Sequence, residues 1–328
     1  MFTLGIGSLS VALAGGPENE AASSPGPDVV DKAVSVIEEH LGSDFDVSQL
    51  YQVAATEIAA EIDELTGRRG NAVLTREQLA SAEAWRKGIR EGIGVEYRLV
   101  PGQGLWLQEI IEGSPGASAG LRHGDMVVGI DGRSFTGLDA AEVLNCIHSK
   151  KNIMRTLDYR RGADLSRVQV RRGTYKVHNL HLHLDSSHPP IIELDFFGEG
   201  ASEDLFDVIT DLQNADSLLL DLRDNQGGML EEAIESAAYF LEPGSVILQR
   251  VTWDGQSQRV ATEQPRIWSG EVVLVVNQGT GGPAEAFVAA LQAHRIGKVV
   301  GTPTAGNAGL PSFHELGSGL VMQLTDEF

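Results

Sequence analysis

The residue types that could do chemistry gather in three glycine-rich segments of the C-terminal half. These segments are Asp221 to Gly228, Asn277 to Glu285 and Gly301 to Ala308. Each follows an apolar run of the kind that forms a strand, and the first two lead into helical patterns. Turns that join strands to helices are the usual ligand sites of α/β folds, so we expect ligands to bind at these turns.

The hydroxyl of Thr280 is the candidate nucleophile in the second segment. It would need a neighbouring base to take its proton. By residue type the bases are His294 and His314, but neither stands in a motif, and Lys298, the one lysine beyond Lys176, begins a strand instead of a turn. A threonine that hydrogen-bonds its own loop is the simpler interpretation, which we favour.

Two segments contain the residue types of a metal site. One is a histidine cluster ahead of the core, made up of His178, His181, His183 and His188. His181 and His183 would share one face of a strand, and zinc would need a third ligand such as Asp185 or Glu193. The other is the acidic turn 221–224, whose charge Arg223 can balance. We favour surface histidines and a structural turn, and predict neither a metal nor another cofactor.

The charge balance of the whole chain excludes some classes of partner. Its 328 residues include 46 acidic and 25 basic side chains, which gives a net charge of −21. Nucleic-acid backbones and anionic membrane surfaces both need a basic patch, so neither is an expected partner. The single cysteine, Cys146, excludes an intrachain disulfide, a cysteine zinc site and an iron–sulfur cluster. The length allows two or three small domains.

Residues 1–27 are predicted to be a signal remnant followed by a disordered linker. Residues 1–14 are apolar and end in Ala12-Leu13-Ala14, a cleavage-like pattern, but they are too short to cross a bilayer and lack a preceding positive segment. This pattern favours a periplasmic or secreted protein. The protein would be cytoplasmic if residues 1–14 are not a signal remnant.

Residues 28–91 are predicted to form a helical domain. Apolar residues recur at helical spacing up to Gly42 and again from Val47 to Leu65. A third helix begins at Thr75, where Thr75 and Gln78 make a capping-box pattern. Apolar stripes of this kind are most often core or helix–helix contacts.

At residue 92 the sequence changes to short β-runs separated by turns. Three motifs follow in order: Gly92-Ile93-Gly94-Val95, a segment from Glu112 to Leu121, and a turn from Gly124 to Gly132. Together they resemble a PDZ domain, which we place at residues 92–174. The resemblance implies that an extended peptide adds to an exposed strand, while N–H groups at 92–95 bind its terminal carboxylate. The alternative is that these glycines only permit a tight turn.

Residues 175–328 alternate strands and helices, and here the resemblance extends over most of the chain. The three glycine-rich segments, taken from Leu220 onward, are similar in order to the L-D-L-R-N-N-P-G-G, N-x-G-S-A-S-A-S-E and G-x-x-T-F-G-K-G motifs of the carboxyl-terminal processing peptidases. These tail-specific serine proteases carry helices, a PDZ domain and a core related to the crotonase-like fold. The predicted fold class is therefore α/β multidomain.

The residues that this family uses for catalysis are missing at the matching positions. The nucleophilic serine stands three residues before the glutamate of its motif, and Gly282 occupies that position. Asn307 replaces the lysine base, and Pro311 replaces the assisting glutamine. In the family, the residue after the nucleophile lends its backbone N–H to the oxyanion. Pro283 occupies that position here and has no N–H. The resemblance places Gly227 or Gly228 near the former oxyanion site.

We therefore predict a pseudopeptidase that binds C-terminal peptides or unfolded segments of partner proteins through its PDZ domain. One alternative is an active serine-type endopeptidase that uses substitute residues, with Thr280 as fallback nucleophile. The other is a small ligand in the vacated cleft, where N–H groups of Gly279 to Gly282 would form an anion-binding nest.

A homo-oligomer is a further expectation. Family members usually continue well past the lysine turn, whereas this sequence stops after the strand Leu320 to Leu324. Such an ending would leave a sheet edge that a second subunit could cover.

Overall fold

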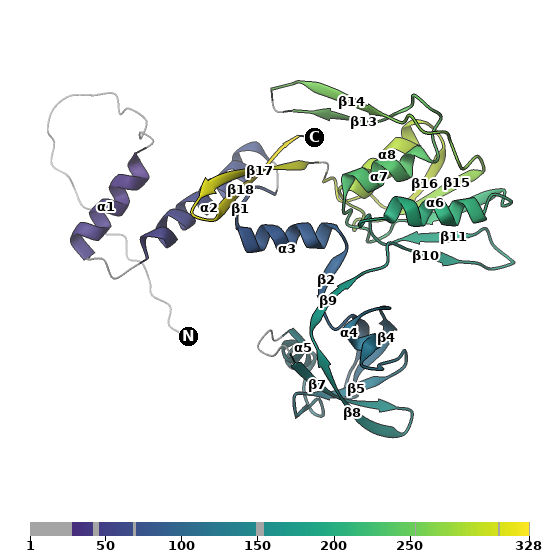
Figure 1. Ribbon diagram of the computed structural model, residues 1–328, viewed down its shortest axis with the longest axis horizontal. Helices are drawn as coiled ribbons and strands as arrows, with labels where there is room; N and C mark the ends of the chain where they lie inside the picture. The colour runs from purple at the N-terminus through teal and green to yellow at the C-terminus, as the bar shows by residue number, and fades with distance from the viewer. Residues whose placement is uncertain are drawn as a thin grey trace. The chain divides into compact units, whose positions relative to one another are not determined.

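A computed structural model describes residues 28–41, 46–67, 70–148, 154–252, 254–307 and 309–327 (Figure 1). The predicted signal remnant and linker at residues 1–27 lie outside these residues. As predicted, the fold is mixed α/β, with a helical segment, a PDZ-like β domain and an α/β core. The chain divides into two compact units between Ile58 and Ala59. Within the described ranges, no helix has the length and apolar character that crossing a membrane requires.

The described chain begins with two helices, α1 (Val29–Leu41) and α2 (Val47–Thr66), the second of which runs across the division between the units. The Tyr51 hydroxyl donates a hydrogen bond to Asp31 at 3.0 Å. The apolar stripe of α2 is not the buried contact that its spacing indicated, because Val53, Ile58 and Leu65 are 53%, 54% and 72% exposed.

A three-stranded sheet joins two distant parts of the chain. Its central strand is β18 (Leu320–Glu327), which pairs antiparallel with β1 (Ala72–Thr75) on one side and β17 (Leu310–Gly317) on the other. The region 28–91, predicted to be helical, also contains strand β1. The strand at 320–324 is paired on both sides, so among the described strands the edges of this sheet are β1 and β17.

Helix α3 (Arg76–Arg86) follows β1 directly and begins where the sequence predicted. The Gln78 N–H donates to Thr75 Oγ1 at 3.1 Å, and the Thr75 N–H donates to Gln78 Oε1 at 2.8 Å. This confirms the capping box, which satisfies two N–H groups that a helix start leaves unpaired. The helix is followed by the strand β2 (Ile89–Gly92).

The PDZ-like domain is built on one antiparallel sheet in the order β3-β4-β5-β7-β8, with β6 paired to β5. Its strands are β3 (Val95–Val100), β4 (Gly104–Ile110), β5 (Met126–Ile130), β6 (Arg133–Ser134), β7 (Met154–Arg161) and β8 (Asp164–Arg171). Two helices accompany the sheet, α4 (Pro115–Ser118) and α5 (Ala140–His148). Strand β3 lies at one end of the sheet, with β4 as its only partner among the described strands.

The PDZ-like domain is connected to the rest of its unit by a two-stranded ribbon. The chain enters through β2 and leaves through β9 (Gly173–Lys176), and these strands pair antiparallel from Ile89 with Lys176 to Gly92 with Gly173. The predicted domain boundary between 174 and 175 therefore falls inside a strand.

The core is a five-stranded sheet in the order β10-β11-β12-β15-β16, parallel from β11 to β16 and antiparallel at β10. The strands are β10 (Leu180–His183), β11 (Ile191–Leu194), β12 (Ser217–Asp221), β15 (Glu271–Val276) and β16 (Gly297–Gly301). Helices α6 (Ala201–Asp211), α7 (Leu230–Ala238) and α8 (Pro283–Ala293) pack with this sheet around fully buried side chains such as Leu220, Leu274 and Phe287.

A separate antiparallel hairpin, β13 (Val246–Val251) and β14 (Ser257–Ala261), follows α7. The sequence analysis did not predict it. Figure 1 shows the hairpin extending beyond the sheet and its helices. One residue of β13, Arg250, contributes to the site described next.

Candidate functional site

The three glycine-rich segments meet around one pocket of about 890 Å³. The first follows β12, the second opens α8, and the third follows β16, so parallel strands deliver all three to one edge of the sheet. The pocket lining contains Gly228 and every position at which the family's catalytic residues were expected: Gly282, Pro283, Asn307 and Pro311. The structure thus brings together the positions that the sequence singled out.

Gly282 stands at the start of α8 with an unusual backbone conformation, φ 56° and ψ −125°. A Cβ placed on it would lie 3.8 Å from the Gln226 carbonyl oxygen and 3.9 Å from the Asn307 carbonyl oxygen, which are ordinary contact distances. The site therefore has room for a side chain at the position of the family's nucleophile, and this sequence supplies none.

Glu285 holds two of the segments together. Its carboxylate accepts hydrogen bonds from the N–H of Gly282 at 3.0 Å and from the Thr304 hydroxyl at 2.6 Å. It also accepts from the N–H groups of Gly306 at 2.7 Å and Asn307 at 2.8 Å. Hydrogen bonds to a charged acceptor are stronger than neutral ones, so Glu285 fixes the turn at 304–307 against the start of α8.

Thr280 is fully buried beneath the pocket. Its hydroxyl donates to the Leu222 carbonyl oxygen at 2.7 Å and accepts from the Asn277 N–H at 3.1 Å. Both contacts tie the second segment to its own strand and to the segment after β12. The Thr280 hydroxyl therefore hydrogen-bonds its own loop and the neighbouring segment, as the favoured interpretation predicted.

The predicted anion-binding nest at Gly279 to Gly282 is wrong, because all four of its N–H groups already have acceptors. The Gly279 N–H donates to the Asn277 side chain, and the Thr280 N–H donates to the Asn277 carbonyl. The Gly281 N–H donates to the Asn225 carbonyl at 2.9 Å, and the Gly282 N–H donates to Glu285. All four N–H groups of residues 279–282 are hydrogen-bonded within the protein, so none is left for an anion.

The former oxyanion region retains one candidate donor. The Gly227 N–H is taken by the Asn225 side chain at 2.8 Å, and Pro283 has no N–H to offer. The Gly228 N–H has no hydrogen-bond partner among the residues that the structure describes. Glycine is required here, because a Cβ on Gly228, at φ 129°, would lie 2.4 Å from the Phe197 carbonyl oxygen.

The acidic turn after β12 is balanced internally, as expected of a structural turn. Arg223 donates from Nε and Nη2 to the two carboxylate oxygens of Asp221, at 2.9 and 2.6 Å. This hydrogen-bonded pair raises the pKa of the Arg223 guanidinium. Asp224 accepts from the Asn277 side-chain amide at 3.1 Å, which ties the turn to the second glycine-rich segment.

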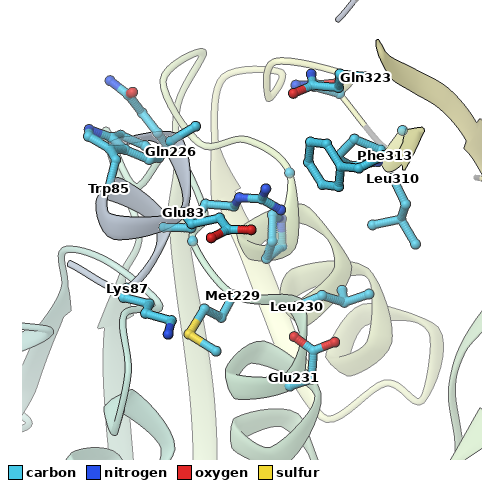
Figure 2. Close-up of a pocket in the computed structure, with 18 of the residues that line it drawn as sticks. Glu83, Trp85, Lys87, Gln226, Met229, Leu230, Glu231, Leu310, Phe313 and Gln323 are labelled. Atoms are coloured by element: carbon cyan, nitrogen blue, oxygen red, sulfur yellow. The ribbon is translucent and has the colours of Figure 1, made fainter. Parts of the chain in front are cut away.

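One wall of the pocket comes from residues that were not expected from the sequence. Figure 2 draws Glu83 and Trp85 on one side and Leu310 and Phe313 on the other, and Lys87 also lines the pocket. Lys87 follows α3 and lies outside residues 175–328, where the family's lysine base was expected. The capping box marks where this helix starts, but no local signal shows that its other end reaches the core.

His178, His181 and His183 of the predicted cluster line one pocket together with Glu193 and Asp195. His183 Nε2 lies 3.0 Å from Glu193 Oε2, and His181 Nε2 lies 3.2 Å from the buried Oδ2 of Asp195 without forming a hydrogen bond. Among the described residues, no group of three or more histidine, cysteine or acidic side chains is arranged to hold a metal ion. Burial and the carboxylates of Glu193, Glu109 and Glu96 raise the pKa of Asp195 to about 7.

The PDZ-like domain contains a second pocket, of about 310 Å³, beside the free side of β3. Its lining includes all four residues of the predicted carboxylate loop, Gly92, Ile93, Gly94 and Val95, together with apolar side chains such as Leu107 and Ile147. The loop is held from behind. The Gly94 carbonyl accepts from the Ile111 N–H at 3.0 Å and from Ser114 Oγ at 3.2 Å.

Comparison with known proteins agrees with these two sites. Residues 190–327 match peptidase family S41, and residues 108–161 match the PDZ domain. The carboxy-terminal processing protease CtpA of Bacillus subtilis is 28% identical over 255 residues, which cover 77% of this chain and 54% of that protein. Over most of its length the chain is therefore similar to the carboxyl-terminal processing peptidases. It spans about half the length of the curated relatives it matches.

A second relative and a solved structure show the same similarity in sequence and in fold. A "Probable CtpA-like serine protease" of Staphylococcus aureus (strain COL) is 26% identical over 258 residues, covering 77% of this chain and 51% of that protein. The solved structure of the photosystem II D1 C-terminal processing protease superposes with a TM-score of 0.55 at 17% identity, covering 91% of this chain and 87% of that one. At this identity the likeness concerns the fold alone.

Proposed function

We propose that this protein, which is similar to the carboxyl-terminal processing peptidases, binds the C-terminal peptides of partner proteins through its PDZ domain and does not cleave them. The observation that carries the proposal is the convergence of Gly282 and Asn307 on one pocket. Gly282 and Asn307 occupy the positions of the family's nucleophile and base, and neither has the side chain that the reaction needs.

Three parts of the reaction are missing at once. Gly282 offers no oxygen to attack a peptide carbonyl, and the amide of Asn307 has no useful basicity. Pro283 removes one oxyanion donor, and loss of a single donor costs roughly 100- to 1,000-fold in rate in other hydrolases. Thr280 does not replace the nucleophile, because its hydroxyl is buried and already donates to Leu222.

The PDZ domain retains what peptide binding requires. Strand β3 is an edge strand with an apolar pocket beside it, which suits the addition of an extended peptide. The loop at 92–95 borders this pocket, where it can receive the terminal carboxylate. The partners that fit are apolar C-termini or unfolded segments, and the apolar start of the sequence favours a periplasmic or secreted setting for them.

The test measures cleavage and binding together on the purified full chain. An unfolded protein and a peptide with an apolar C-terminus are incubated with the chain and with Thr280→Ala, and products are followed by mass spectrometry. We expect peptide binding and no cleavage. Cleavage that Thr280→Ala abolishes would contradict the proposal and establish an active endopeptidase with a rebuilt site. Cleavage that the variant retains would point to a contaminant or another nucleophile.

A variant of the groove separates PDZ binding from other contacts. Ile147 of α5 lines the pocket, so Ile147→Asp places a charge against the apolar peptide end. Asn145→Asp adds the same charge to an exposed position of the same helix and serves as the control. We expect at least tenfold weaker peptide binding for Ile147→Asp and unchanged binding for Asn145→Asp. Equal affinities would place the peptide elsewhere.

A further inference from the structure

We propose that the vacated cleft of the core is itself a ligand site, which binds the free carboxyl terminus of an apolar peptide. This site is separate from the PDZ groove. The inference rests on the part of the proposed function that leaves the cleft without a nucleophile, and it does not depend on peptide binding by the PDZ domain.

The cleft has unoccupied space at Gly282. In a peptidase this position carries the attacking oxygen, whereas here the nearest atoms to a virtual Cβ are two carbonyl oxygens at 3.8 and 3.9 Å. A peptide carboxylate has one oxygen more than the carbonyl of a peptide bond. The missing side chain leaves room for that second oxygen.

The cleft also contains a guanidinium group with a buried, unpaired N–H among the described residues. Arg250 of β13 lines both the large pocket and a smaller one beside it. Its Nε is buried and has no hydrogen-bond partner among the described residues. A buried N–H without an acceptor is costly, and a carboxylate is the acceptor that a guanidinium binds most strongly. The Gly228 N–H, unpaired in the same pocket, is a second donor.

The smaller pocket has a largely apolar lining. It measures about 240 Å³ and is bordered by apolar side chains of α7, α8 and β17, namely Leu230, Ala286, Ala289 and Leu310, with Leu248 of β13. Gly282, Asn307 and Arg250 border it as well. An apolar last side chain would therefore enter this pocket while its carboxylate remains beside Arg250 and Gly282.

The large pocket has room for the residues that precede such an end. Strand β17, which contributes Leu310 and Phe313 to the lining, has β18 as its only partner strand among the described residues. An edge strand beside a cleft offers N–H and C=O groups to an extended peptide. These features favour a peptide over a free apolar acid.

The test uses the full chain carrying Ile147→Asp, so that the PDZ groove does not contribute. Fluorescence anisotropy compares a labelled hexapeptide ending in two valines, with a free carboxylate, with the same peptide ending in an amide. We expect at least tenfold weaker binding of the amide. Arg250→Gln should weaken binding of the carboxylate peptide at least tenfold and change binding of the amide peptide little. Arg259→Gln, on the neighbouring strand, should leave both unchanged.

A second variant and two further readouts make each outcome decisive. Ala289→Phe fills the apolar pocket from an exposed helical position and should also weaken the carboxylate peptide, with an unchanged melting temperature for the protein. Equal binding of acid and amide, or no effect of Arg250→Gln, would overturn the inference. Competition by decanoate as strong as by the peptide would assign the site to free apolar acids and overturn it also. Peptide mass is checked after each titration, because cleavage would contradict the proposed function, whereas intact but unbound peptide contradicts only this inference.

Discussion

The PDZ groove and the cleft of the core are both built from glycine-rich loops held by hydrogen bonds, but they differ in the groups that stand in front of those loops. In the groove, the loop at 92–95 is fixed from behind by Ser114 and Ile111, and its front borders an apolar pocket. In the cleft, Glu285 fixes the loops, while Gly282 and Asn307 bring neither a hydroxyl nor an amine to it. The comparison shows that hydrogen bonds can hold a glycine-rich loop in place whatever side chains it carries.

The largest effect should come from removing the residue that holds the cleft. Glu285→Ala leaves the N–H groups of Gly282, Gly306 and Asn307 and the Thr304 hydroxyl without their acceptor. We expect the free energy of unfolding in urea to fall by about 2–4 kcal/mol.

The control for this variant is Glu271→Ala, an exposed glutamate at the start of β15, which should change stability by less than about 0.5 kcal/mol. Equal effects of the two variants would show that Glu285 does not hold the cleft. The comparison between groove and cleft would then fail.

The buried hydroxyl beneath the cleft should matter for stability. Thr280→Val keeps the shape but leaves the Asn277 N–H without its acceptor. It also removes a donor from the Leu222 carbonyl oxygen, which keeps the Asn225 N–H, so we expect a loss of about 1–3 kcal/mol in urea unfolding. Thr302→Val, at an exposed position, is the matched control. A stability equal to that of the control would contradict the structural role.

Peptide binding to the PDZ groove should weaken when alanine replaces Gly94 and should not change when alanine replaces Gly102. Gly94→Ala places its Cβ 2.2 Å from Ser114 Cβ, whereas Gly102→Ala has nothing within 4 Å, and both glycines have similar positive φ angles, 68° and 72°. Both variants bear a backbone strain of about 1–2 kcal/mol. By fluorescence anisotropy, only Gly94→Ala should weaken peptide binding, at least tenfold or about 1.4 kcal/mol. Equal losses would separate the loop from the binding site.

The smallest effect concerns the carboxyl group of Asp195, whose pKa is affected by burial and by Glu193 of β11, Glu109 of β4 and Glu96 of β3. The pKa of Asp195 is raised to about 7, above its ordinary value of about 3.9, so the folded protein holds this proton over a range in which the unfolded chain has lost it. Stability should therefore fall as the pH rises from about 4 to about 7. Asp195→Asn removes this loss and should stabilise the protein more at pH 8 than at pH 5.

We expect this difference to be about 1 kcal/mol, because the Asp195 side chain is 35% exposed and solvent weakens its interactions. Chemical denaturation at the two pH values measures it. Asp211→Asn, at an exposed position of α6, serves as the control. A variant whose stability gain is the same at both pH values would show that Asp195 does not titrate in this range.

Much of the core could be predicted because its signals are local. Apolar runs marked β12 and β15, and the glycine-rich motifs marked the turns that follow them. The resemblance to the family's motifs implied that the positions of Gly282 and Asn307 lie close together, and a Cβ placed on Gly282 would lie 3.9 Å from the Asn307 carbonyl oxygen. A parallel sheet brings the ends of its strands to one edge whatever the residues there do.

Other features could not be predicted because they depend on distant partners. The glycines at 279–282 have the composition of an anion nest, and only the positions of Asn225, Asn277 and Glu285 show that their N–H groups are taken. Strand β1 is four residues long and too short to be distinguished by periodicity. The contribution of α3 to the pocket follows from tertiary packing, which its own sequence does not encode.

The pairing of β1 with β18 also has a consequence for the order in which the protein is made. Ala72 pairs with Gln323, so about 250 residues must be synthesised before this strand meets its neighbour. At about 5–20 residues per second, that takes on the order of 10–50 s. The PDZ-like domain and the central sheet can fold during this interval. The wall of the cleft that α3 supplies can be completed only after Gln323 has been synthesised.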